Sequence, residues 1–243
     1  MPQLMPAGID LTLQALFWST ATIALYLAAR AVYRRWPRWW LMPLAIAPLG
    51  LILTALALHT SYRDYSRGTH WLVSLLGPAT VAFAVPIYQR RALIRRHWRV
   101  LATGMVLGSA TSMLTAWGLA RLLGLSDTLT LSLLPRSMST PFAMTVSSEI
   151  GGAPDLTAVF VIVTGVVGAA IGDVLLLRFP IRSSLALGAL LGVAAHGAGT
   201  AKAHEIGQEE GAVAGLVMVL VGLFNVLLVP LLMMAQKLVS HGV

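Results

Sequence analysis

The chain has 243 residues, of which 57% are hydrophobic and 11% are charged. Its mean hydropathy of +0.80 excludes a soluble domain, since soluble domains carry about 25% charged residues. We therefore expect an all-α polytopic membrane protein that forms a single transmembrane domain over residues 1–243. At about 20 apolar residues per crossing, this length allows about seven or eight membrane segments.

The formal net charge is +8, from 17 Lys and Arg residues against 9 Asp and Glu residues. The basic residues gather beside apolar segments, mainly at 30–38 and 90–99. That placement is typical of cytoplasmic loops and of contact with anionic membrane lipid. No basic surface interleaved with aromatic residues is present, so we expect no nucleic-acid partner.

The first half of the chain contains four predicted apolar segments, at 11–33, 41–60, 71–89 and 99–123. Arginine and tryptophan side chains at 34–40 indicate a cytoplasmic interface, which places the N-terminus outside. The polar sequence 61–70 is expected to form an external loop. Gly77-Pro78 and Pro86 predict a kink within the third segment, because an interior proline removes a helical hydrogen bond.

The second half contains three more apolar segments, at 156–178, 183–206 and 211–235. Arg178 and Arg182 indicate that the first of these ends in the cytoplasm. Because the segment at 99–123 already ends outside, parity makes residues 127–150 a re-entrant hairpin. We expect the tip of that hairpin near Pro135–Pro141.

We expect the segment at 183–206 to cross the membrane, with a break in its helix at 196–200. Lys237 then indicates a cytoplasmic C-terminus. On this count the segments within 41–123 and those within 156–235 form two triplets of opposite topology. Such an inverted repeat with discontinuous helices is a recurrent transporter plan.

Two polar patches interrupt this apolar sequence, and each combines a cation with small hydroxyl residues. The first patch consists of Arg136, Ser137, Ser139 and Thr140. A cation at membrane depth is a functional candidate by default, and the guanidinium fork binds a carboxylate through two parallel bonds. A half-helix beginning near Pro141 would add free N–H groups and a positive dipole end. The alternative is an exposed loop with an ordinary arginine.

The second patch consists of His196, Thr200 and Lys202, which we expect to complete a substrate site. His196 is also a candidate proton relay, because histidine titrates near neutral pH. Glu209 is a second candidate for proton coupling. The alternatives are a packed histidine that caps freed carbonyl groups, and a solvated glutamate at the membrane edge.

No catalytic motif is present, neither GxSxG nor HExxH nor a phosphate-binding loop. The chain also has no cysteine, which excludes disulfides and cysteine-ligated metal. We therefore expect no catalytic residues, no metal and no cofactor.

Several motifs resemble those of the LrgB/CidB family, closest to its bacterial branch with the YohK proteins. They are LPRSMSTP at 134–141, HGAGTAK at 196–202 and EEGA at 209–212, supported by SYRDYSRG at 61–68 and LLGPATVAFAVPIYQ at 75–89. The likeness covers about residues 40–235. Two positions depart from the family pattern: Lys202 stands where arginine is common, and Ala195 where serine is frequent.

The resemblance implies a bacterial inner-membrane protein with one of two functions. Family members are described as modulators of murein hydrolase export and autolysis, beside a small LrgA/CidA-like membrane partner. A plastid relative moves glycolate and glycerate, and bacterial pairs are linked to pyruvate uptake. We therefore expect a carrier of small 2-hydroxy or 2-oxo monocarboxylates, or a holin-associated regulator without a substrate of its own. Stripes of small residues favour a homodimer.

Overall fold

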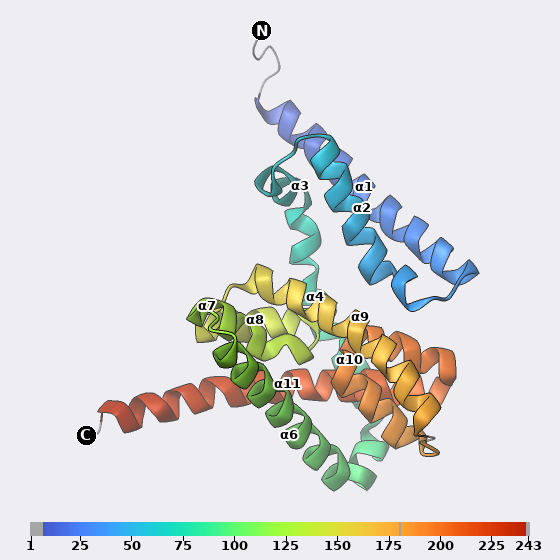
Figure 1. Ribbon diagram of the computed structural model, residues 1–243, viewed down its shortest axis with the longest axis vertical. Helices are drawn as coiled ribbons and strands as arrows, with labels where there is room; N and C mark the ends of the chain where they lie inside the picture. The colour runs from blue at the N-terminus through green and yellow to red at the C-terminus, as the bar shows by residue number, and fades with distance from the viewer. Residues whose placement is uncertain (1–6, 180, 242–243) are drawn as a thin grey trace. The chain divides into compact units, whose positions relative to one another are not determined.

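The computed structural model of the chain describes residues 7–179 and 181–241, and these contain helices and no strand (Figure 1). The all-α prediction is confirmed, and the N-terminal end at 1–6 lies outside the described residues. Among the described residues, six helical stretches are long and apolar enough to cross a membrane by length and composition alone, and they include the kinked stretch Tyr62–Gln89 and the stretch Ser184–Ile206. Pro43–Ala57 is a shorter apolar helix. The elements are α1 (Ala7–Arg35), η1 (Trp39–Leu41), α2 (Pro43–Ala57), α3 (Tyr62–Ser74), α4 (Leu76–Ala82), α5 (Ala84–Gln89), α6 (Arg91–Leu122), α7 (Asp127–Leu133), η2 (Leu134–Ser137), α8 (Thr140–Ile150), α9 (Pro154–Arg178), α10 (Ser184–Ile206) and α11 (Gln208–His241).

The chain divides into two compact units, residues 1–79 and 80–243, with the boundary inside α4. In the first unit α1 packs against α2 and α3. Ser19 Oγ donates to the Gly68 carbonyl oxygen at 3.2 Å and accepts from Trp71 Nε1 at 2.7 Å. Gly68 permits this approach, since a Cβ there would lie 3.1 Å from the Ala15 Cα.

The prediction of a loop at 61–70 is wrong, because most of that sequence forms the start of α3. Ser61 caps the helix by accepting a hydrogen bond from the Asp64 backbone N–H. A Ser N-cap and an acidic residue in the first turn both stabilise a helix start. The helix also packs against α1, and this packing holds a polar sequence in helical form.

Two prolines account for the breaks that separate α3, α4 and α5. Pro78 and Pro86 cannot bond to the residue four positions earlier, and those residues, Ser74 and Ala82, are where α3 and α4 end. Leu75 and Phe83, between the helices, stay in the right-handed helical region. The chain is thus kinked rather than unwound here, as the sequence predicted.

In the second unit, residues 127–150 form a hairpin of α7, η2 and α8. The two helices are about 10 Å and about 16 Å long at 1.5 Å per residue, which is too short to cross a core of about 30 Å. The Ala153 N–H, just after α8, donates to Ser132 Oγ in α7 at 2.8 Å. This bond joins the end of the second arm to the first arm, so residues 127–150 form a hairpin that turns at 134–139. That the hairpin is re-entrant stays a prediction.

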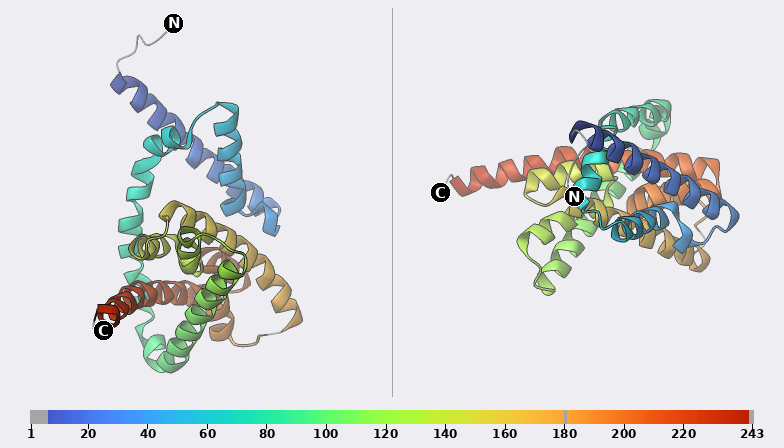
Figure 2. Two further views of the ribbon diagram at one scale, coloured as in Figure 1. Left: turned by 60° about the vertical axis from the view of Figure 1, so that its left-hand side comes forward. Right: turned by 90° about the horizontal axis from the view of Figure 1, so that it is seen from above.

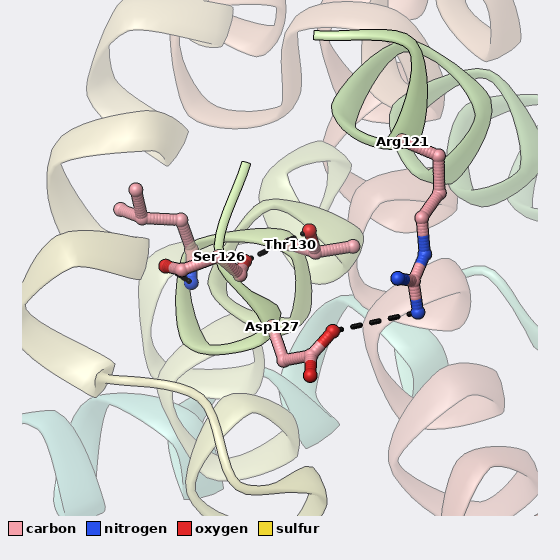
Figure 3. A network of polar contacts seen from close by, with 5 residues as sticks. Arg121, Ser126, Asp127 and Thr130 are labelled. Atoms are coloured by element: carbon pink, nitrogen blue, oxygen red, sulfur yellow. Dashed lines mark hydrogen bonds and ion pairs between the residues drawn. The ribbon is translucent and has the colours of Figure 1, made fainter. Parts of the chain in front are cut away.

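Figure 3 shows how the chain enters this hairpin from α6. Gly124, at φ 65°, ends α6 with a left-handed residue that a glycine adopts without strain. Arg121 then pairs with Asp127 at 3.4 Å across the turn. Thr130 Oγ1 donates to the Ser126 carbonyl oxygen at 3.0 Å, and this bond stabilises the first turn of α7.

The second hairpin is α10 itself, and the prediction that 183–206 crosses the membrane is wrong. His196 has φ 37° and ψ −114°, which divides α10 into arms at 184–195 and 197–206. A Cβ at Gly188 would lie 2.7 Å from the Glu210 carbonyl oxygen. A straight α10 would put Ile206 about 27 Å from Gly188, and the four residues onward to Glu210 span at most about 14 Å.

The chain must therefore reverse at His196, and two further contacts agree. A Cβ on Gly199, in the second arm, would clash with the carbonyl oxygen of Leu191 in the first. Gly192 of the first arm lies against Ala214, so α10 and α11 are side by side (Figure 2). The sequence placed the break correctly, and the residue at which the chain reverses is His196.

This reversal changes the predicted repeat and the number of crossings before the C-terminus. The repeat within the second unit is a crossing helix followed by a hairpin: α6 with residues 127–150, then α9 with α10. The two hairpins enter from opposite ends of the bundle. Lys237, from which the cytoplasmic C-terminus was predicted, lies among residues whose side chains the structure does not describe.

Small residues recur along one face of α6, and Gly108, Ala116 and Ala120 pack inside the chain, whereas a Cβ on Gly104 would meet nothing within 4 Å. A Cβ on Gly108 would lie 2.6 Å from Val193 Cγ1, and Ala116 and Ala120 are buried. Close helix approach through small residues is the role this stripe plays here. The homodimer accordingly stays a prediction.

Cysteine labelling distinguishes the hairpin from a spanning α10, since the natural chain has no cysteine. We expect single cysteines at Ser183 and Ile206 to react with a membrane-impermeant maleimide from the same side of the membrane. Leu123→Cys, at the end of α6, should react from the opposite side and serves as the control. Labelling of Ser183→Cys and Ile206→Cys from opposite sides would contradict the hairpin.

Candidate functional site

The tips of the two hairpins meet at one hydrogen bond. His196 Nε2 lies 3.1 Å from the Arg136 carbonyl oxygen, and because a carbonyl only accepts, Nε2 donates. His196 is 3% exposed and has a positive φ. A non-glycine residue in such a conformation stores strain that the surrounding packing must hold, and such residues gather at functional sites.

Gly165 of α9 leaves the space that the His196 ring occupies. A Cβ at Gly165 would lie 3.3 Å from the ring's Cε1 and 3.4 Å from its Nδ1. One turn further on, Gly168 faces Ala195 in the same way, at 3.0 Å. Gly165 and Gly168 of α9 therefore leave the room that lets the second tip lie beside the first.

Arg136 carries the charge at this junction. Its side chain is half-buried, and Nη1 donates to the Ser112 carbonyl oxygen of α6 at 3.3 Å. Ser112 lies about 15 Å along α6 from Leu122, near the middle of a core about 30 Å thick. Within the described residues no carboxylate forms an ion pair with this guanidinium, and its hydrogen bond goes to a backbone carbonyl.

Two helix N-termini also converge on the junction. Ser139 precedes α8, and its Oγ is buried without a partner among the described residues, so the first turn of α8 lacks a side-chain cap. Thr140 opens that turn and is half-buried. The second arm of α10 begins at Gly197, directly after His196. Uncapped N–H groups and the positive ends of helix dipoles both favour an anion.

A small cavity lies beside the first tip, between α6, η2, α10 and α11. Its volume is about 10 Å³, which is room for one water molecule. Its polar lining comes from Ser109, Ser112, Ser137 and Asn225. Of these the sequence analysis identified only Ser137. Asn225 carried a usable signal, since it is a single amide in an otherwise apolar segment.

The structure does not bring every predicted site residue to the junction. Thr200 Oγ1 donates to Met218 Sδ of α11 at 3.9 Å. Lys202 lies about 9 Å beyond His196 along the second arm, and its Nζ pairs with Glu205 at 3.1 Å. Glu209 is exposed in the first turn of α11. The residues at the tips are thus Arg136, Ser137, Ser139, Thr140 and His196.

A buried hydroxyl network holds the first hairpin against α9. Thr157 Oγ1 lies 3.0 Å from the Ser132 carbonyl oxygen and 2.7 Å from Ser147 Oγ. All three side chains are fully buried. Gly152 passes so close that a Cβ there would meet Ser147 Oγ at 2.5 Å. Ser132 of the first arm and Ser147 of the second arm are thereby both hydrogen-bonded to Thr157, near the start of α9.

Replacing Thr157 with valine should lower the stability of the chain. The change keeps the shape but removes the bonds to Ser132 and Ser147, which we expect to cost about 1–3 kcal/mol. SDS titration followed by circular dichroism measures the loss. Thr145→Val is the matched control, because the exposed Thr145 bonds only to the Pro141 carbonyl. Equal midpoints for both variants would contradict a stabilising role for the network.

Comparison with known proteins relates the chain to one family. The sequence profile of the LrgB-like family matches residues 22–235. The uncharacterized protein YwbG of Bacillus subtilis is 38% identical over 212 residues, which cover 87% of this chain and 94% of YwbG. The holin-like protein CidB of Staphylococcus epidermidis RP62A is 31% identical over 222 residues, 91% of this chain and 97% of CidB. No solved structure matches.

Proposed function

The chain belongs to the LrgB-like family, and from that premise we propose that it carries small 2-hydroxy or 2-oxo monocarboxylates, such as glycolate, glycerate or pyruvate, across the bacterial inner membrane. The observation that carries the proposal is the junction of the two hairpin tips. A guanidinium that pairs with no carboxylate among the described residues lies there, together with the uncapped first turn of α8. Together they form an anion site in an apolar bundle.

The chemistry of binding follows from the donors at the junction. The Arg136 fork would bind both carboxylate oxygens in parallel. N–H groups in the first turns of α8 and of the second α10 arm would share the remaining charge. Ser137, Ser139 and Thr140 would supply hydroxyl donors at the rim. His196 would couple a proton, because a charge on its ring is stabilised when an anion lies beside it.

The two hairpins also suggest how the site opens. They enter the bundle from opposite ends, so displacing one hairpin exposes the tips to one side only. That is the arrangement of alternating-access transporters with inverted repeats. Applying the positive-inside rule at Arg178 and Arg182 places the α10 hairpin on the cytoplasmic side and the end of α11 outside.

Arg136→Gln tests the site. We expect uptake of labelled glycolate and pyruvate into proteoliposomes to fall roughly tenfold to a hundredfold, since a charge-assisted bond contributes about 1.5–3 kcal/mol. The exposed Arg121 provides the matched control as Arg121→Gln. Arg136→Lys should give an intermediate rate, because it keeps the charge and loses the fork. Unchanged uptake in Arg136→Gln would rule out this residue as the carboxylate clamp.

A second function is favoured by the likeness to the holin-like CidB proteins, which covers 91% of the chain. On this proposal the chain modulates murein hydrolase export and autolysis beside an LrgA/CidA-like partner, and needs no substrate of its own. Expression of Arg136→Gln in a strain that lacks this protein distinguishes the two proposals. Restored lysis kinetics without carboxylate uptake would support the regulator; lysis that follows uptake would count against it.

A further inference from the structure

A groove lies between α6 and the first arm of α10, away from the hairpin tips. Its lining is mainly apolar and includes Val100 and Met105 of α6, Leu185 of α10 and Val217 of α11. Gly104 keeps it open, because a Cβ there would meet nothing within 4 Å. The volume is about 170 Å³, and an apolar cavity of about 150 Å³ takes up a molecule the size of benzene. The groove therefore has room for a segment of hydrocarbon chain.

A hollow lined by basic side chains adjoins this groove. Arg95, Arg96 and Arg99 line the hollow and are exposed, and Val100 belongs to both the hollow and the groove. At 3.6 residues per turn, a regular helix spreads such consecutive residues around its whole circumference. His97, at φ −118° and ψ 21°, interrupts α6 here. The interruption lets consecutive residues gather around one hollow.

The groove also has an arginine at its α10 wall. Ser183, which caps the first arm of α10, lines the groove together with Val100. The residues that precede these two, Arg182 and Arg99, therefore lie at the same end of the bundle, and Arg182 is exposed. Among the described residues, no carboxylate forms an ion pair with Arg182 or with the three arginines of the hollow. Unpaired cations beside an apolar groove match a molecule with an anionic head and an apolar chain.

We propose that this groove and the arginines beside it bind one anionic phospholipid of the cytoplasmic leaflet. The guanidinium groups would donate parallel bonds to the phosphate, and one acyl chain would lie along Gly104. The exposed Trp98 suits the headgroup region, and the guanidinium carbon of Arg99 lies 5.5 Å from the centre of its ring. Because the first arm of α10 forms one wall, the lipid would hold that hairpin against α6.

Native mass spectrometry of the full chain in detergent measures the headgroup part of the site. The probes are phosphatidylglycerol and phosphatidylcholine with the same acyl chains. For the natural chain we expect one phosphatidylglycerol to bind at least tenfold more tightly than phosphatidylcholine. The double variant Arg96→Gln/Arg99→Gln should weaken phosphatidylglycerol binding roughly tenfold to thirtyfold and phosphatidylcholine binding much less, because cations near the surface attract the anionic lipid. Arg121→Gln removes the same charge at the other end of α6 and should change neither affinity.

Gly104→Phe tests the acyl-chain part, because its ring would fill the groove. We expect both lipids to bind at least tenfold more weakly. Gly118→Phe is the matched control, since Gly118 is also exposed on α6 with nothing within 4 Å of a Cβ and does not line the groove. Gly104→Leu, a smaller obstruction, should weaken binding less and guards against a folding defect. Glycerol 3-phosphate, which lacks an acyl chain, should not displace the lipid.

Equal affinity of the natural chain for the two lipids, or an unchanged affinity ratio in the double arginine variant, would overturn the anionic headgroup site. Equal effects of Gly104→Phe and Gly118→Phe would overturn the acyl-chain seat. Displacement by glycerol 3-phosphate would make the arginines a site for a soluble phosphate instead. A dimer that is lost in Gly104→Phe while lipid binding is unchanged would make the groove an interface between two copies. Each readout is binding, so it does not depend on the proposed carboxylate transport.

Discussion

The second unit depends on the requirement that backbone polar groups find partners when no water can reach them. A chain that reverses twice inside a bundle of apolar helices frees several such groups, and it does so at Arg136 and at His196. The structure places these two reversals against each other, so that the imidazole of one binds the backbone carbonyl of the other. Each tip thus supplies a hydrogen-bonding group to the other, and the two hairpins depend on each other.

Close helix approach makes that arrangement sterically possible. Glycines on α9 and α10 lie where any side chain would meet a neighbouring backbone: Gly168 against Ala194, Gly188 against Glu210 and Gly192 against Ala214. In lipid, helix association depends on such packing rather than on the exclusion of water. The same closeness leaves little free volume beside the first tip, where the cavity measures only about 10 Å³.

Much of this architecture was predictable from local sequence. Apolar length predicted the long helices, and the parity of the charged loops, which rests on Arg178 and Arg182, predicted a hairpin at 127–150. The reversal of α10 was missed, since helix-forming residues continue on both sides of His196 and a histidine at positive φ has no sequence signature. Ser112 was missed for another reason: the cavity that it lines assembles from segments over a hundred residues apart.

The bond between the tips joins residues 60 positions apart in the chain. Ribosomes add about 5–20 residues per second, so the first tip must spend about 3–12 s in or near the membrane before His196 is synthesised. The hydroxyl network around Thr157 closes earlier, because Thr157 follows Ser132 by 25 positions. During biosynthesis the first hairpin therefore binds α6 through Arg136 and Ser112, and α9 through Thr157, before His196 is synthesised. This interval is when insertase contact or misfolding would act on it.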